Sequence, residues 1–299
     1  QYFSAPLDAS NPYSDGNPVY DKDEKSGKYI VVDDRKNTVP NYDKDFCTLF
    51  PRMWSGQGNH ITGYKNWTNP HNYRKIEKMN PQTREMEALE KPTFGQNLYF
   101  FFAYQMGWMY SRYFLWNFVG RQNEIQGHSN ASNGNWISGI TPLDKARLGP
   151  QSGLPDGADG NKAKNKMYFL PLLLGILGMW YQLKRDNKNF TVVALLFFFT
   201  GIAIVIYLNQ KPFEPRERDY AYAGSFYAFA FWIGLGVMAV YEMLAKKMKE
   251  NQSAILASLI CLIAVPCVMA NAEWDDHNRS HRTIARDFAS DYLNSCAPN

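Results

Sequence analysis

This sequence of 299 residues has only four cysteines and five histidines, and neither sign of charge is in large excess. Of the four cysteines, Cys261 and Cys267 lie inside an apolar run, and a bridge between Cys47 and Cys296 has no support, so no disulfide scaffold is predicted. The 32 basic and 28 acidic residues are dispersed and leave a formal charge of +4, which gives no case for nucleic-acid binding. His60 has no second histidine or paired carboxylate at ligand spacing, so no metal site is predicted.

Long apolar runs are confined to the part of the chain that follows Lys166. Each of the four runs is about long enough to cross a hydrocarbon core of roughly 30 Å; they are residues 167–183, 190–208, 222–244 and 253–270. Only short polar linkers separate them, and backbone groups in lipid must be hydrogen-bonded within each segment. The sequence therefore predicts a mainly α, polytopic helical membrane protein. Its four transmembrane helices occupy residues 166–272, and a soluble helical region begins in residues 273–299.

The segment of residues 97–120 could be a fifth span or a surface helix. It is long enough to span, but Gln105, Arg112 and Asn117 are costly at the centre of a bilayer. Its tyrosine and tryptophan rings favour the headgroup zone. We therefore expect an amphipathic helix that lies in the membrane interface.

The polar residues before Lys166 are expected to form a large extracytoplasmic region of mixed loops, in residues 1–96 and 121–165. Residues 28–32 predict a short β element, because a run of β-formers is bounded there by turn residues. The charged residues 71–91 are expected to form a solvated helix and its connection. The aromatic residues of 46–67, with Arg52 and His60 among them, predict a small local core.

The orientation follows from the basic residues of the linkers. Residues 184–188 and 246–250 carry three basic side chains each, which favours the cytoplasm for both. The linker of residues 210–220 also has three, but its net charge is near zero, so it is placed outside with the polar half. The chain begins at Gln1 without a signal peptide, and we expect it to be an internal piece of a larger protein.

The linker of residues 210–220 carries six charges at a membrane boundary and is the first candidate site. A lipid-linked sugar donor presents phosphate at this depth, and guanidinium groups bind phosphate through forked hydrogen bonds. Arg216 and Arg218 are therefore candidate phosphate-binding residues. The side chains that could orient them or line a groove are Glu214, Glu217, Asp219 and Tyr220. A salt-bridged cap that joins two spanning helices to the polar region explains the same residues equally well.

The second candidate is the loop of residues 121–128, beside the aromatic helix. Amide, carboxylate and guanidinium groups suit the recognition of sugar hydroxyls, and the best candidates are Arg121, Gln122 and Glu124. For most positions of this loop, hydrogen bonding to its own backbone is the favoured interpretation.

Three segments carry a resemblance to a known family. Residues 113–128 read Tyr-Phe-Leu-Trp-Asn-Phe-Val-Gly-Arg-Gln-Asn-Glu-Ile-Gln-Gly-His, residues 134–140 read Gly-Asn-Trp-Ile-Ser-Gly-Ile, and residues 214–222 read Glu-Pro-Arg-Glu-Arg-Asp-Tyr-Ala-Tyr. Together with residues 97–112, they resemble bacterial multi-pass membrane glycosyltransferases related to protein O-mannosyltransferases, within the GT-C class. The resemblance implies a bacterial inner-membrane protein whose main loops face the periplasm.

The resemblance also implies sugar transfer from a polyprenyl-phosphate donor to an extracytoplasmic protein or glycan acceptor. GT-C enzymes carry their catalytic acidic residue in the first extracytoplasmic loop, which we expect to lie outside this sequence, so no catalytic residue is assigned. No organic cofactor is implied, and a divalent cation is left open. The competing class is a non-enzymatic membrane scaffold subunit of a secretion or transport assembly.

Overall fold

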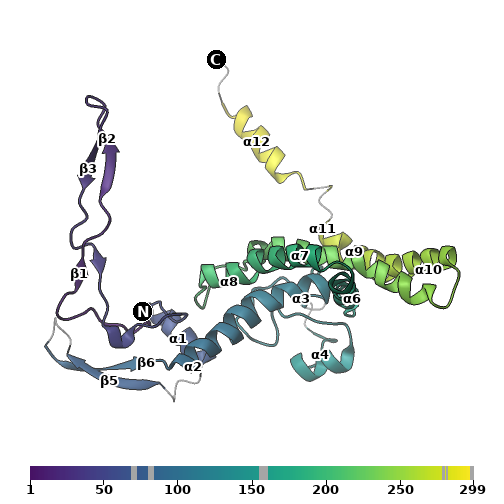
Figure 1. Ribbon diagram of the computed structural model, residues 1–299, viewed down its shortest axis with the longest axis horizontal. Coiled ribbons are helices and arrows are strands. Elements are labelled where there is room, and N and C mark those ends of the chain that lie inside the picture. Colours follow the sequence, from purple (N-terminus) through teal and green to yellow (C-terminus); the bar gives the residue numbers. More distant parts are fainter. Residues whose placement is uncertain (69–72, 80–83, 155–160, 278–279, 281, 297–299) are drawn as a thin grey trace. The chain divides into compact units, whose positions relative to one another are not determined.

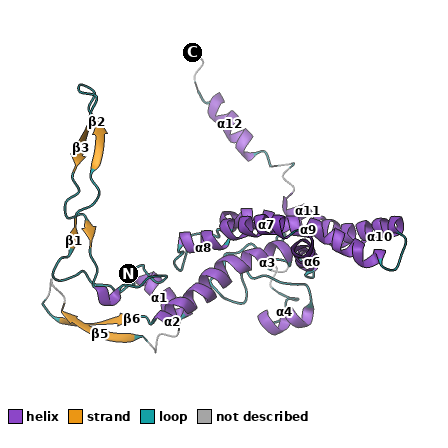
Figure 2. Cartoon of the chain, viewed as in Figure 1, coloured by secondary structure: helices purple, strands orange, loops and turns teal. Residues whose placement is uncertain are grey.

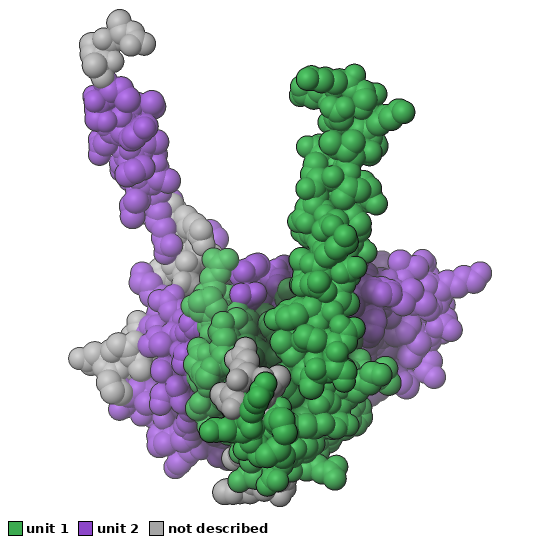
Figure 3. All heavy atoms as spheres, turned by 90° about the vertical axis from the view of Figure 1, so that its left-hand side faces the viewer, with its two compact units in different colours: residues 1–110, 204–217 green, residues 111–203, 218–299 purple. Residues whose placement is uncertain are grey.

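The computed structural model of the protein is mainly helical (Figure 1) and describes residues 1–68, 73–79, 84–154, 161–277, 280 and 282–296. The chain forms two compact units, which Figure 3 shows in different colours. Unit 1 contains residues 1–110 and 204–217, and unit 2 contains residues 111–203 and 218–299. Each unit is therefore built from two separate stretches of sequence.

Unit 1 contains three antiparallel two-stranded sheets (Figure 2). The pairs are β1 (Tyr13–Ser14) with β4 (Val39–Pro40), β2 (Val19–Lys22) with β3 (Tyr29–Asp33), and β5 (Arg74–Met79) with β6 (Met86–Lys91). Strand β3 confirms the β element predicted at residues 28–32.

The helix predicted within residues 71–91 is wrong in the described part of that range, which forms the hairpin of β5 and β6. The register places Lys78 opposite Glu87, and Ile76 opposite Leu89. Opposite charges and apolar side chains that face each other across strands stabilise a hairpin. Lys78 Nζ itself forms ion pairs with Asp43 (2.9 Å) and Asp45 (2.8 Å), so the charges of this hairpin also attach it to the rest of unit 1.

The aromatic core predicted in residues 46–67 is present in unit 1. Its helices are η1 (Lys44–Phe46), α1 (Gly58–Trp67) and the start of the long helical segment, α2 (Phe94–Phe100). Phe46, Tyr64 and Phe100 are fully buried, and the rings of Tyr64 and Phe100 meet edge to face with centroids 5.0 Å apart. A capping box of Thr93 and Gln96 fixes the start of α2.

The helix expected at residues 97–120 continues from α2 through the π-helical segment η3 (Phe101–Ser111) into α3 (Arg112–Phe118). Gln105 and Arg112, which suggested an interfacial position, are buried and donate to backbone carbonyls, Gln105 Nε2 to Gln210 O at 2.7 Å and Arg112 Nη1 to Gly134 O at 2.7 Å. Arg112 and the amide nitrogen of Gln105 are therefore hydrogen-bonded within the protein, whereas Gln105 Oε1 is buried without a partner among the described residues. The position of the helix relative to a bilayer stays a prediction.

The apolar half of the chain is a series of helices. They are α6 (Leu170–Arg185), α7 (Asn187–Thr200), α8 (Ile202–Leu208), η4 (Asp219–Tyr222), α9 (Ala223–Ala245), α10 (Glu250–Leu262), η5 (Ile263–Cys267) and α11 (Val268–His277). Helix α4 (Thr141–Leu148) precedes them, and α12 (Ile284–Asn294) follows. Among the described residues, three segments are long and apolar enough to cross a membrane: Asn187–Leu208, Asp219–Ala245 and Glu250–Trp274. They correspond to three of the four predicted runs.

Helix α6 corresponds to the remaining predicted run but has only 16 residues, about 24 Å at 1.5 Å per residue. Tyr168 and Phe169 both have positive φ, and Pro171 occupies the first turn, so the helix begins later than the apolar run. It packs closely on α9 through Gly175 and Gly178. A fourth crossing by α6 stays a prediction.

The fourth crossing can be tested by the side from which residues flanking α6 are labelled. We expect cysteines at Lys162 and Lys188, one introduced at a time, to react with an impermeant maleimide from opposite sides of the membrane. A cysteine at Lys249 should react from the same side as one at Lys188. The exposed Cys47, Cys267 and Cys296 are first replaced by serine. Labelling of positions 162 and 188 from one side would contradict a crossing by α6.

Candidate functional site

The charged linker begins at a set of hydrogen bonds within unit 1. Asn209, just after α8, donates through Nδ2 to Pro51 O (2.9 Å), and its own carbonyl accepts from Trp54 Nε1 (3.1 Å). Gln105 Nε2 donates to Asn209 Oδ1 (3.1 Å) as well as to the Gln210 carbonyl. The backbone of the linker is therefore fixed where the candidate span Asn187–Leu208 ends.

Glu214 points into the polar core of unit 1 rather than to solvent, since only 8% of its surface is exposed. It lies within electrostatic range of His60, whose Nδ1 is 2.8 Å from Ser55 Oγ. Burial and the nearby charge of Lys211 lower the pKa of His60, and Glu214 opposes this shift. Burial raises the pKa of Tyr64 to about 12. Glu214 therefore lies inside unit 1, and its contact with a ligand stays a prediction.

The two predicted phosphate-binding arginines belong to different compact units, because the division falls between Glu217 and Arg218. Arg216 is exposed and Glu217 is partly exposed in unit 1. In unit 2, Arg218 precedes η4, Asp219 is its first residue, and Tyr220 is exposed. A shared site of Arg216 and Arg218 stays a prediction.

Arg218 is held in unit 2 by Tyr113 of α3. The backbone N–H of Arg218 donates to the Tyr113 hydroxyl (3.2 Å), and the ring of Tyr113 lies 6.2 Å from that of Tyr222. Tyr113 and Tyr222 are both fully buried. This contact joins the segment of residues 97–128 to the segment of residues 214–222. Two of the segments that carry the family resemblance are thus brought together.

Arg112 and Arg121 stack on the same aromatic group, which Arg218 meets through its backbone N–H. The guanidinium carbon of Arg112 lies 4.5 Å from the ring centroids of both Tyr113 and Trp116, and that of Arg121 lies 4.2 Å from the centroid of Trp116. Among the described residues, the buried Trp116 Nε1 has no hydrogen-bond partner. We call Arg112, Tyr113, Trp116, Arg121 and Arg218 the arginine–aromatic cluster. It combines cationic groups with an indole donor that lacks an acceptor.

Arg121 and Arg218 were predicted from the sequence as site residues, whereas Arg112 was considered only as a cost to membrane insertion. The spacing of Arg112 and Trp116, four residues apart in a helix, is the signal that could have placed them on one face. The position of Arg121 over the ring of Trp116 depends on the turn after Phe118, where α3 ends. Helical periodicity does not predict that turn.

The other candidates of the loop differ in their surroundings. Gln122 is buried, and its amide is used fully: Oε1 accepts from Asn135 N (3.3 Å) and Nδ2 (2.9 Å), while Nε2 donates to Ala131 O (3.0 Å) and Gln151 Oε1 (3.0 Å). No donor or acceptor of Gln122 is left for a sugar. Glu124 is exposed. Only Arg121 of this loop joins the cluster.

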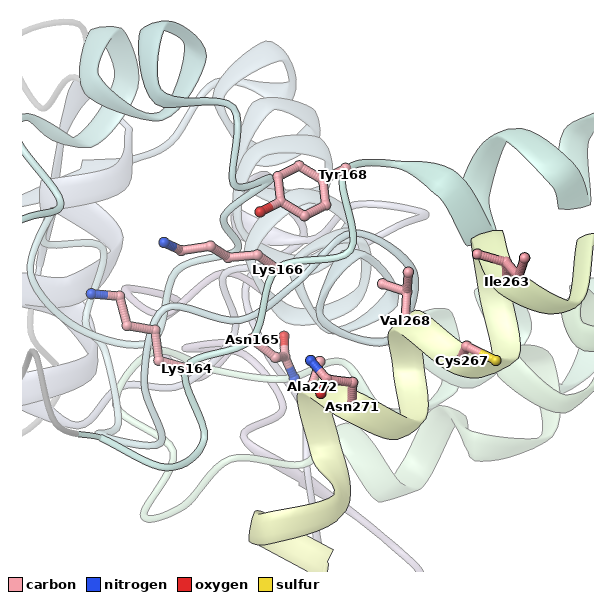
Figure 4. A pocket seen from close by; sticks show the side chains of 9 residues that line it. All are labelled: Lys164, Asn165, Lys166, Tyr168, Ile263, Cys267, Val268, Asn271 and Ala272. Carbon is pink, nitrogen blue, oxygen red and sulfur yellow. The ribbon is translucent and has the colours of Figure 1, made fainter. Parts of the chain in front are cut away.

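A cavity of about 700 Å³ in unit 2 was not indicated by the sequence (Figure 4). Residues 164–168 form one wall, and η5 with the start of α11 forms the other. The amines of Lys164 and Lys166 extend to one side, away from η5 and α11, and Asn165 Nδ2 donates to Glu273 Oε1 (3.2 Å). The cavity therefore presents amides and apolar side chains rather than a concentrated positive charge.

Within the described ranges, no group of three or more histidine, cysteine, aspartate or glutamate side chains is arranged to hold a metal ion. The divalent cation that the sequence analysis left open is not addressed by this finding.

Comparison with models of protein families gives a match to the first part of the chain. A model of a family of unknown function (DUF8416) matches residues 1–102 of the 299. No curated protein and no solved structure matches the chain. The matched range covers the strands and the aromatic core of unit 1 but ends before Arg112. It does not bear on the glycosyltransferase resemblance, which stays a prediction.

Proposed function

We propose that this chain is part of an integral membrane glycosyltransferase of the GT-C class. In this proposal, it transfers a sugar from a polyprenyl-phosphate donor to an acceptor outside the cytoplasm of a bacterium, in protein O-glycosylation. The observation that carries it is the contact of Tyr113 with Arg218 and Tyr222, which joins two of the segments that resemble this class. Three segments of membrane-spanning length and composition agree with a lipid-linked substrate.

The proposed role of the arginine–aromatic cluster is to bind the donor phosphate. Arg218 stands directly before Asp219, the first residue of a candidate span, where a lipid phosphate reaches the membrane boundary. In the transfer, the bond from the anomeric carbon to the phosphate oxygen breaks, and an acceptor hydroxyl forms the new bond to that carbon. Negative charge grows on the departing phosphate, and forked guanidinium hydrogen bonds stabilise it. The group that removes the acceptor proton is not assigned to any residue of this chain.

Replacement of Arg218 by lysine tests this role. Lysine keeps the positive charge but loses the planar fork, so we expect transfer of sugar to the acceptor to fall by roughly tenfold or more. The amount of protein in the membrane should stay unchanged. Tyr113→Phe should lower transfer less, because it removes only the hydroxyl that positions the Arg218 backbone. Acceptor glycosylation and membrane protein level are measured together for each variant.

Arg185→Lys is the matched control, because Arg185 forms an exposed ion pair with Glu242 (2.6 Å) outside the cluster. We expect this variant to transfer sugar at the normal rate. If Arg218→Lys and Arg218→Ala also transfer normally, the cluster does not bind the donor. If both variants instead lower the amount of protein, the linker is a structural cap, as a non-enzymatic scaffold requires.

A further inference from the structure

Every residue of strands β2 and β3 is exposed. Its apolar side chains would be expected in a core, yet Ile30, Val31 and Val32 are 49%, 50% and 56% exposed. Tyr20 and Tyr29 are exposed as well. Figure 2 shows this hairpin extending away from the helices of unit 1. Such side chains lose favourable burial unless another surface covers them.

The hairpin also lacks the partners that normally stabilise a sheet. Among the described residues, its sheet contains only β2 and β3, so the outer edge of β3 carries backbone groups without a neighbouring strand. A two-stranded hairpin is at best marginally stable in water, and three or more strands with an apolar face are needed for independent stability. An exposed apolar edge is also a template for pairing with a further strand.

The sequence of β3 and its flanks is complementary to itself in the antiparallel direction. Residues 28–34 read Lys-Tyr-Ile-Val-Val-Asp-Asp. When two copies align with Val31 opposite Val31, Ile30 faces Val32, Tyr29 faces Asp33, and Lys28 faces Asp34. Symmetry produces each of these unlike pairs twice. Apolar side chains then meet at the centre and opposite charges meet at both ends, which is the pattern that stabilises cross-strand pairs.

We propose that the outer edge of β3 pairs with β3 of a second copy of this chain, about a two-fold axis at Val31. The product is a four-stranded antiparallel sheet in the order β2, β3, β3, β2. A two-fold interface uses the same surface on both copies, as this edge does. The short edge buries less area than a stable soluble dimer needs, so the pairing acts between copies that are already confined to one membrane.

Other symmetric alignments of the same edge are less favourable. With a two-fold axis perpendicular to the sheet, even-numbered residues face even-numbered residues, and odd-numbered residues face odd-numbered ones. The nearest alternative alignments therefore have the axis at Ile30 or at Val32. An axis at Val32 places Asp33 opposite Val31 and Asp34 opposite Ile30. An axis at Ile30 places Lys28 opposite Val32. Of these three axes, only the one at Val31 opposes Lys28 to Asp34 and keeps Ile30, Val31 and Val32 opposite one another.

Cysteine cross-linking in membranes that contain the full chain tests the pairing. Opposed residues in antiparallel strands have Cα atoms about 4.5–5.5 Å apart, which is within disulfide range. Val31→Cys is therefore expected to give a disulfide-linked dimer. Val32→Cys is the matched control, because it is similarly exposed, yet its two copies would lie about 8 Å apart. The dimer should form roughly tenfold faster from Val31→Cys, since only that pair is within bonding distance.

The end charges give a second test in the Val31→Cys background. Lys28→Asp places like charges opposite each other at both ends, so the rate of cross-linking should fall. The double change Lys28→Asp and Asp34→Lys restores unlike pairs and should restore the rate. The native exposed cysteines are replaced by serine throughout. Equal cross-linking of the two cysteine variants, a disulfide only to a different protein, or no recovery by the charge swap would overturn the proposal.

Discussion

Replacement of Gly178 by leucine should prevent α6 from packing on α9 and should lower the amount of folded protein severalfold. Gly178 lies on α6, where a Cβ atom would collide with the carbonyl oxygen of Trp232 and would lie 2.5 Å from Gly236 N of α9. Both obstacles are backbone atoms, so rotation of a side chain cannot make room. The two helices can accept the larger residue only by moving apart.

The opposing surface shows the same close approach. A Cβ atom at Gly236 would meet the carbonyl oxygen of Leu174, and one at Gly175 would meet the ring of Phe229. Small residues that let two backbones come together are typical of helix contacts in membranes, where apolar burial drives association little. Separating the helices also disturbs the cluster around Phe229 and Trp232. Overpacking of this kind costs about 1–3 kcal/mol, and more where backbone must move.

Gly234→Leu provides the matched control for this prediction. Gly234 lies on α9 only two residues from Gly236, and no atom lies within 4 Å of a Cβ built there. We expect Gly234→Leu to accumulate normally and to unfold at the temperature of the unchanged protein. The measurements are the amount of membrane protein and the thermal unfolding midpoint after purification. Equal behaviour of the two variants would show that α6 does not pack on α9 in this way.

The contact of α6 with α9 shows where sequence analysis reaches its limit. The length and apolarity of residues 190–208, 222–244 and 253–270 predicted three candidate spans, because these properties belong to single segments. Which face of α6 meets which residues of α9 depends on a fit between distant surfaces. Gly178 and Gly236 carry no signal that they oppose each other until both helices are placed.

The candidate site shows the same limit. Arg218 was named from a short charged motif, and the structure adds Tyr113 from a segment more than 100 residues away. Gln122 was named because its amide suits sugars, but the chain itself uses all four of its hydrogen-bonding positions. Local composition thus identified residues capable of the chemistry. It could not separate those that are engaged within the fold.

Replacement of Arg52 by methionine should loosen unit 1. Arg52 is 6% exposed, its guanidinium carbon lies 3.8 Å from the ring centroid of Phe50, and Nη1 donates to the carbonyl of Ile206 (3.0 Å) in the last turn of α8. Burial lowers the pKa of Arg52. A cation is favourable at the C-terminal end of a helix, where carbonyl groups lack intrahelical partners. Methionine fills similar space without the charge or the donor, so about 2 kcal/mol of stability should be lost.

Lysine at position 52 should not rescue this loss. Its ammonium group is more strongly hydrated than guanidinium and does not stack on Phe50, so burying it costs more. Both variants should therefore show a lower thermal midpoint and faster proteolysis between Phe46 and Trp67. Arg286→Met, which removes an exposed ion pair with Asp287, is the control and should change neither measurement.

A rise in the stability of the Arg52→Met variant would be equally informative. No carboxylate lies within ion-pair distance of Arg52 in the part of the chain that the structure describes. Its Nε atom also lacks a hydrogen-bond partner there. A buried charge that is poorly compensated lowers stability, and an apolar replacement then raises it. If Arg52→Met raises the thermal midpoint, the cap on α8 is not the reason for this arginine. The buried guanidinium would then be held at a cost in stability, as expected for a group that binds an anion.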